Sequence, residues 1–174
     1  MKNILETVLK IDTKVYLRIH GLNKNKMLHL LMKYLTHLGS TPFGYFYGGL
    51  IFAFIYLNNQ KLEALLISII LSQTIVHILK RLINRPRPYR KMILETVKNP
   101  PKCVYSFPSG HTAVGLTTSL GASVIWPSLM PVFLVVAVGV GLSRIVLGYH
   151  YPVDVFFGGL IAFGIHLLSV AIFM

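Results

Sequence analysis

Five long apolar runs constrain the fold of this chain more than any other feature of its sequence. They cover residues 41–57, 62–80, 110–126, 130–147 and 153–173. Each run is long enough to cross a hydrocarbon core of about 30 Å once polar ends and tilt are allowed for. A backbone in lipid must satisfy its own hydrogen bonds, and a single segment does so as a helix. We therefore expect an all-α, polytopic membrane bundle of five transmembrane helices.

The overall composition agrees with lipid as the solvent of this chain. Apolar residues make up 54% of the 174 positions and charged residues 13%, whereas a soluble domain carries about a quarter charged residues. The remaining charge is one-sided, with 17 Lys and Arg against 5 Asp and Glu. Such an excess favours an anionic partner, either a membrane surface or a phosphorylated ligand. With this hydropathy, nucleic acid is not expected as a partner.

Two amphipathic segments precede the apolar runs, at residues 2–20 and 26–38. In the first, Lys10, Lys14 and Arg18 follow one another at a spacing of four, away from the apolar face. The second would reach only about 20 Å as a helix, which is too short to cross the membrane. We expect both segments to lie as helices in the membrane interface.

The chain is expected to form a single domain. It is too short for two domains of ordinary size, and it contains no internal repeat of 20–50 residues. Within residues 1–174 we distinguish the interfacial segments at 1–38 from the transmembrane core at 41–174.

Polar residues cluster where four ends of the expected spans meet. If the spans alternate in direction, the ends of the second and fourth and the starts of the third and fifth share one membrane face. Three cations, two histidines, a carboxylate and a Ser-Gly pair stand at these ends: Lys80, Arg87, Arg144, His111, His150, Asp154, Ser109 and Gly110. Charges near lipid are costly, and chance placement would not bring them together.

These residue types suit the transfer of a phosphoryl group. The reaction needs donors that stabilise charge on the phosphate oxygens, an in-line nucleophile and a proton for the leaving group. Arg grips two phosphate oxygens at once, Lys acts as a point charge, and a helix start presents free N–H groups. We expect the N–H groups of Ser109 and Gly110 to face the anion.

The spacing divides the work between the two histidines. Pro152 suits the first position of a helix, which places Asp154 about one turn after His150. The carboxylate would accept a hydrogen bond from Nδ1 of His150 and direct the other ring nitrogen at phosphorus. We therefore expect His150 to be the nucleophile that forms a phosphohistidine, and His111 to be the general acid.

Three short motifs resemble the signature of the type 2 phosphatidic acid phosphatase (PAP2) superfamily. They read Lys80-x6-Arg87-Pro88, Pro108-Ser109-Gly110-His111 and Ser143-Arg144-x5-His150-x3-Asp154. The resemblance implies a phosphate site formed by Lys80, Arg87, Ser109, Gly110 and Arg144, and it implies the same roles for His111, His150 and Asp154. It also implies that no metal ion or other cofactor is needed. Relatives of this kind often have a sixth span before the interfacial segment, so six spans are the alternative to five.

The combined prediction is an integral membrane enzyme that hydrolyses a phosphate from a lipid headgroup. Three substrates compete: lipid A 1-phosphate, undecaprenyl pyrophosphate and phosphatidylglycerophosphate. The surplus of cations and the broad amphipathic region at 1–38 favour the large polyanionic headgroup of lipid A. Two other classes stay open, a lipid phosphotransferase and a non-catalytic anion carrier.

The membrane face of the site is a separate question. Of the 17 Lys and Arg residues, Lys61 alone falls on the face opposite the motifs, so the positive-inside rule would place the motifs in the cytoplasm. The resemblance to bacterial relatives implies instead an inner membrane with the site facing the periplasm. We prefer this outward orientation because the connections on the other face are too short to carry many charges.

Several residues near the motifs have a simpler interpretation. The loop cations are expected to lie near acidic lipids, with headgroup recognition as the alternative: Arg85, Arg90, Lys91, Lys98 and Lys102. The aromatic residues at span ends suit the aromatic belt of a membrane protein: Trp126, Tyr149 and Tyr151.

Overall fold

The computed structural model describes residues 2–57, 63–92 and 103–173, and most of these residues are helical. The elements are α1 (Lys2–Gly21), η1 (Leu22–Lys24), α2 (Lys26–Leu38), α3 (Thr41–Leu57), α4 (Glu63–Ile83), α5 (Pro88–Lys91), α6 (Gly110–Ile125), η2 (Pro127–Leu129), α7 (Met130–Val146) and α8 (Pro152–Phe173). Extended pairing in the described part is limited to one isolated bridge, between Pro86 and Tyr105. The predicted all-α class is confirmed.

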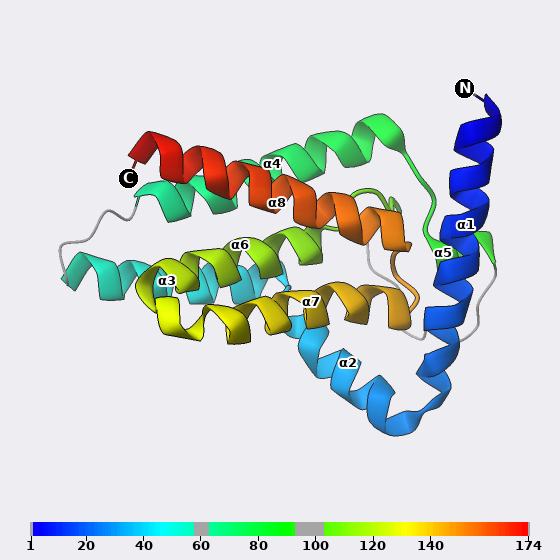
Figure 1. Ribbon diagram of the computed structural model, residues 1–174, viewed down its shortest axis with the longest axis horizontal. Coiled ribbons are helices and arrows are strands. Elements are labelled where there is room, and N and C mark those ends of the chain that lie inside the picture. The colour runs from blue at the N-terminus through cyan, green and yellow to red at the C-terminus, as the bar shows by residue number, and fades with distance from the viewer. Residues whose placement is uncertain (1, 58–62, 93–102, 174) are drawn as a thin grey trace.

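Helix α6 lies at the centre of the bundle. It packs against α3, α4, α7 and α8, and α4 packs in turn against α8. Figure 1 shows these helices lengthwise, with the ends of α4 and α7 and the starts of α6 and α8 gathered at one end of the bundle, next to α1. The four polar segments of the motifs therefore meet at one end, as the alternation of spans predicts.

The five helices α3, α4, α6, α7 and α8 coincide with the five apolar runs. Within the described residues, three stretches are long and apolar enough to cross a membrane: Leu66–Ile83, Pro127–Val146 and Pro152–Ile172. Helices α3 and α6 have 17 and 16 residues, which gives each a length of about 25 Å. The number of spans, five or six, stays a prediction.

The two N-terminal helices cover the end of the bundle that carries the motifs. Helix α2 packs on α7, and α1 contacts both α7 and α8. Asp12, Tyr16 and His20 recur every four residues and form the contacting stripe of α1. Tyr16 is fully buried with its ring 5.3 Å from that of Tyr151, and a ring N–H of His20 donates to the carbonyl of Val146 at 2.8 Å. The placement of both helices in the membrane interface stays a prediction.

Close packing of α8 on the start of α6 depends on the absence of a side chain at Gly158. A Cβ there would meet the carbonyl oxygen of Ser109 and lie 3.2 Å from its carbonyl carbon. Because this obstacle is backbone, we expect Gly158→Ala to lower the free energy of unfolding by about 1–3 kcal/mol. Thermal unfolding in detergent measures the loss.

Gly164→Ala is the matched control for this prediction. Gly164 lies in the same helix, and a Cβ there would meet nothing within 4 Å. Alanine in a helix interior is favoured over glycine by about 0.5–1 kcal/mol, so this variant should be at least as stable as the parent chain. Equal unfolding temperatures for the two variants would contradict the packing argument.

Candidate active site

The loop between α7 and α8 turns back on the end of α7 and carries His150. Gly148 has a φ of 82°, a left-handed conformation that glycine adopts without steric cost. The N–H groups of Tyr149 and His150 then both donate to the carbonyl of Arg144, at 3.0 and 3.1 Å. This tight reversal places His150 beside the last turn of α7.

The segments that follow α4 and precede α6 are joined through their backbones. Pro86 pairs with Tyr105, and the N–H of Ser106 donates to the carbonyl of Arg85 at 2.7 Å. The side chain of Arg87 strengthens the junction, since its Nε donates to the carbonyl of Cys103 at 2.8 Å. These contacts position Arg87 at the end of the bundle.

Three buried cations converge on this end: Lys80, Arg87 and Arg144, which are 8%, 3% and 3% exposed. They lie close enough to interact electrostatically with one another. Among the described residues, none of the three forms a salt bridge with a carboxylate. Instead they donate to neutral oxygens, as Arg144 does to Oγ1 of Thr36 at 2.6 Å and Lys80 to the carbonyl of Tyr105 at 3.4 Å. Buried cations without a carboxylate partner suit an anionic ligand.

The geometry determines which ring nitrogen of His150 is free of a proton. Nε2 lies 3.2 Å from an amino group of Arg87. A guanidinium has donors only, so Nε2 accepts, and the proton of a neutral ring is on Nδ1. Burial lowers the pKa of His150 well below its ordinary value, and the charges of Arg87, Arg144 and Lys80 lower it further. His150 is therefore neutral at pH 7.

The carboxylate of Asp154 is fully buried and makes several contacts. Oδ2 accepts from the hydroxyl of Ser106 and from the N–H of Tyr151, the latter at 2.8 Å. The same oxygen lies 3.7 Å from Nδ1 of His150, which is longer than a hydrogen bond. Nδ1 has no hydrogen-bond partner among the described residues. The structure thus places the two side chains as expected, but at a separation that does not make the expected hydrogen bond.

The start of α6 differs from the expectation in one respect. Ser109 is the N-cap residue, and its hydroxyl accepts from the hydroxyl and the N–H of Thr112, at 2.8 and 3.4 Å. The N–H of Ser109 donates to the carbonyl of Asp154 at 2.9 Å, so it is not free. Gly110 is left as the first donor of the helix. His111 follows it and interacts electrostatically with Arg144 and His150.

Two interpretations of residues near the motifs were wrong. Arg85 is not a free interfacial cation, because it forms ion pairs with Asp12 and Asp154 at 2.6 and 2.7 Å. Tyr151 is 2% exposed, and its ring packs against the guanidinium of Arg85. The guanidinium of Arg144 lies 4.3 Å from the centre of the Tyr149 ring. Tyr151 therefore supports Arg85 instead of facing lipid, whereas the placement of Tyr149 and Trp126 in the aromatic belt stays a prediction.

Sequence reasoning also missed Asp12, Ser106 and Thr36. Asp12 had a weak signal, as one of two acids in the basic N-terminal helix. Ser106 and Thr36 had none, because their partners lie 48 and 108 positions away in the chain. In the described part of the chain, no group of three His, Cys, Asp or Glu residues is placed to hold a metal ion.

Comparison with known proteins identifies the family of the chain. Residues 61–174 match the model of the PAP2 superfamily. A lipid A 1-phosphatase of Rhizobium etli is 31% identical over 101 residues, which are 56% of this chain and 43% of that protein. An undecaprenyl-diphosphatase of Sulfolobus acidocaldarius is 32% identical over 111 residues, which are 62% and 53%. The chain spans about half the length of the curated relatives it matches.

Two solved structures resemble the fold over most of its length. The crystal structure of Aquifex aeolicus LpxE has a TM-score of 0.75 and 27% identity, and the match covers 91% of this chain and 94% of the other. A transmembrane PAP2-type phosphatidylglycerolphosphate phosphatase from Bacillus subtilis has a TM-score of 0.76, covering 95% and 86%; at 21% identity, this likeness concerns the fold alone. Together with the apolar helices, these matches make the chain a multi-pass membrane protein. With its three motifs gathered at one end of the bundle and its matched region spanning residues 61–174, the chain belongs to the PAP2 superfamily.

Proposed function

We propose that this protein is an integral membrane phosphatase that removes a phosphate from a lipid headgroup through a phosphohistidine on His150. The observation that carries the proposal is the convergence of three buried cations, Lys80, Arg87 and Arg144, on a neutral imidazole. The cations lack carboxylate partners among the described residues, which suits them to the charge of a phosphoryl group in the transition state.

The proposed reaction has two steps. Nε2 of His150 attacks phosphorus in line with the ester oxygen while the P–O bond to the lipid breaks, and His111 donates a proton to the departing oxygen. Water then attacks phosphorus while the P–N bond to Nε2 of His150 breaks, a proton of the water passes to His111, and inorganic phosphate leaves. Asp154 stabilises the proton on Nδ1 of His150 during the first step, across the 3.7 Å that separates them.

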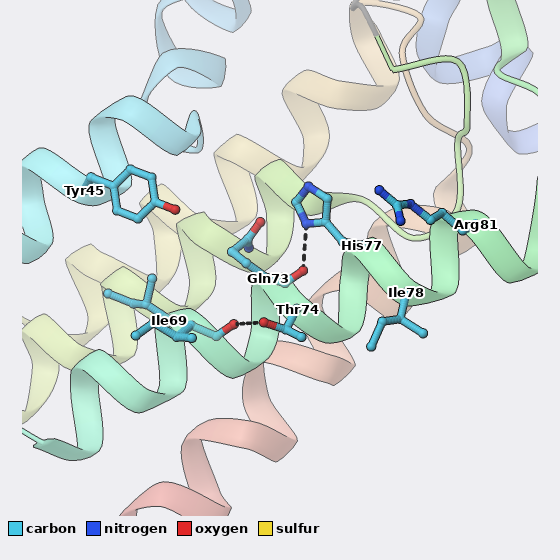
Figure 2. Close-up of a pocket in the computed structure, with 8 residues that line it drawn as sticks. Tyr45, Ile69, Gln73, Thr74, His77, Ile78 and Arg81 are labelled. Atoms are coloured by element: carbon cyan, nitrogen blue, oxygen red, sulfur yellow. Dashed lines mark hydrogen bonds between the residues drawn. The ribbon is translucent and has the colours of Figure 1, made fainter.

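A groove along α4 suits the apolar part of such a substrate. Figure 2 shows it with Tyr45 of α3 on one side and a row of α4 side chains on the other, ending at His77, Ile78 and Arg81. Its volume is about 380 Å³. Arg81 directly follows Lys80 in α4, so the polar end of the groove lies at the same end of this helix as Lys80 of the cation cluster. An acyl chain in this groove would place its headgroup near the site.

Among the candidate substrates we favour lipid A 1-phosphate. Similarity to lipid A 1-phosphatases supports it, and so does the excess of cations for a polyanionic headgroup. Undecaprenyl pyrophosphate is the second candidate, because one relative is an undecaprenyl-diphosphatase. Phosphatidylglycerophosphate is the third.

Phosphate release from the three lipids, measured side by side with the purified protein, tests the proposal. We expect fastest release from lipid A 1-phosphate, and no release from any lipid would contradict the proposed function. Turnover in ¹⁸O-labelled water separates hydrolysis from transfer to an acceptor lipid, since only hydrolysis places the label in free phosphate.

We expect full activity in the presence of EDTA. The proposed steps use side chains alone, and the cations Lys80, Arg87 and Arg144 supply the charge that a metal would otherwise provide. The measurement is the initial rate before and after dialysis against EDTA. Inhibition that added divalent cation reverses would contradict a metal-independent mechanism.

We propose that the site faces outward from a bacterial inner membrane. Cys103 is the sole cysteine of the chain, it is exposed, and its carbonyl accepts from Arg87, so it reports on this face. We expect a membrane-impermeant maleimide to label Cys103 in intact cells, with Cys103→Ser as the unlabelled control. Labelling only after the membrane is permeabilised would place the site in the cytoplasm.

A further inference from the structure

We propose that Arg85 and Asp12 are positioning residues that hold Asp154 beside His150, so that the amphipathic helix α1 completes the active site. Neither residue belongs to the three motifs. The inference rests on the proposed function, because it concerns how the same catalytic group is held.

Arg85 joins two buried carboxylates. One amino group donates to Oδ1 of Asp154 at 2.7 Å and the other to Oδ2 of Asp12 at 2.6 Å. The carboxylates are 0% and 3% exposed, and the guanidinium lies 4.1 Å from the centre of the Tyr151 ring. A planar guanidinium donates in fixed directions, so it sets the separation of the two acids. We call these three residues the ion-pair network.

Asp12 also attaches α1 to the turn of α8 that carries Asp154. Its second oxygen, Oδ1, accepts from the N–H of Val153 at 3.0 Å. Val153 is the second residue of α8, where backbone N–H groups lack partners within the helix and favour a negative charge. The next residues of the contacting stripe are Tyr16, which contacts Tyr151 in the loop before α8, and His20, which contacts Val146 at the end of α7. Helix α1 is therefore bound to the segment on both sides of His150.

The network acts on the chemistry through Asp154. Oδ2 of Asp154 faces His150 and is held by Ser106 and Tyr151, while Oδ1 has Arg85 as its partner in the described part of the chain. Loss of Arg85 would free one side of this carboxylate and leave two buried acids without their shared cation. Among the described residues, neither Arg85 nor Asp12 forms a hydrogen bond with Lys80, Arg87 or Arg144, so the loss should affect the chemical step and leave substrate binding largely intact.

Kinetics of purified variants test the proposal on the lipid that the parent chain hydrolyses best. We expect Arg85→Gln and Asp12→Asn each to lower kcat about 10- to 100-fold with little change in KM. Arg85→Lys keeps the charge but cannot donate to both carboxylates with the planar geometry of a guanidinium. Its kcat should therefore lie between that of Arg85→Gln and that of the parent chain. In an Asp154→Asn background, Arg85→Gln should lower kcat little further, because Arg85 acts through Asp154. The proposal would be overturned if Arg85→Gln lowered kcat by the same factor in that background as in the parent chain, or if it changed KM alone.

Arg90→Gln and Lys14→Gln are matched controls, since both residues are exposed and lie on the same two segments. Both variants should keep the parent kcat.

A second measurement needs no substrate: thermal unfolding of Arg85→Gln, Asp12→Asn and the double variant. The two changes should be non-additive, because the side chains are in contact, and additive shifts would overturn the network. If the parent chain releases phosphate from no lipid, the proposed function fails, while this unfolding cycle still decides whether the network exists.

Discussion

His150→Ala is expected to lower phosphate release at least about 10³-fold, because it removes the atom that attacks phosphorus. His150 is 1% exposed and its Nε2 faces the guanidinium of Arg87. The proposed nucleophile therefore lies where the three buried cations Lys80, Arg87 and Arg144 converge. With ³²P-labelled lipid, the parent chain should form an acid-labile, base-stable phosphoprotein on rapid quenching, and His150→Ala should form none.

Two further histidine variants make this result specific. His111→Ala removes the proton donor and keeps the nucleophile, so it should recover part of its rate with p-nitrophenyl phosphate, whose leaving group needs no proton. His37→Ala changes an exposed histidine at the end of α2 and should retain the parent rate. A phosphoprotein that forms in His150→Ala would move the nucleophile to another residue and contradict the assignment.

The positions of the helices could be read from the sequence because each depends on local patterns. The apolar run at 41–57 has the same first and last residues as α3. Pro152 is the first residue of α8, as the preference of proline for the first turn of a helix predicts. Helix α4 continues three residues past the predicted end, through Arg81, Leu82 and Ile83. None of these residues disfavours a helix, and the helix ends only before Asn84, which has a left-handed backbone conformation.

The support of the site could not be read in this way, because its contacts join distant parts of the chain. Arg85 and Asp12 lie 73 positions apart, and Arg144 and Thr36 lie 108 apart. In the sequence, Arg85 is one of several basic residues in a loop. Only the folded chain brings an acid of the N-terminal helix within reach of it. The motifs thus predicted which residues gather at one end of the bundle as candidates to act on phosphate, and the tertiary structure was needed to find what holds them.

Arg144→Gln is expected to lower kcat/KM about 10³-fold and to abolish stabilisation of the protein by inorganic phosphate. Arg144 is 3% exposed, its Nε has no hydrogen-bond partner in the described structure, and its guanidinium lies 4.3 Å from the centre of the Tyr149 ring. A buried donor of this kind gains a partner when an anion binds. Phosphate should therefore raise the unfolding temperature of the parent chain by mass action.

The same substitution should cost little stability when no phosphate is present. Arg144 interacts with the nearby charge of Arg87, and removing one of the buried like charges offsets the packing and the hydrogen bond to Thr36 that are lost. Thr36→Val removes that hydrogen bond and keeps the charge, so we expect a loss of only about tenfold in kcat/KM. Arg90→Gln, on an exposed arginine, should change neither property. Phosphate that stabilises Arg144→Gln as much as the parent chain would show that Arg144 does not bind the anion, and the phosphate site would then rest on Lys80 and Arg87.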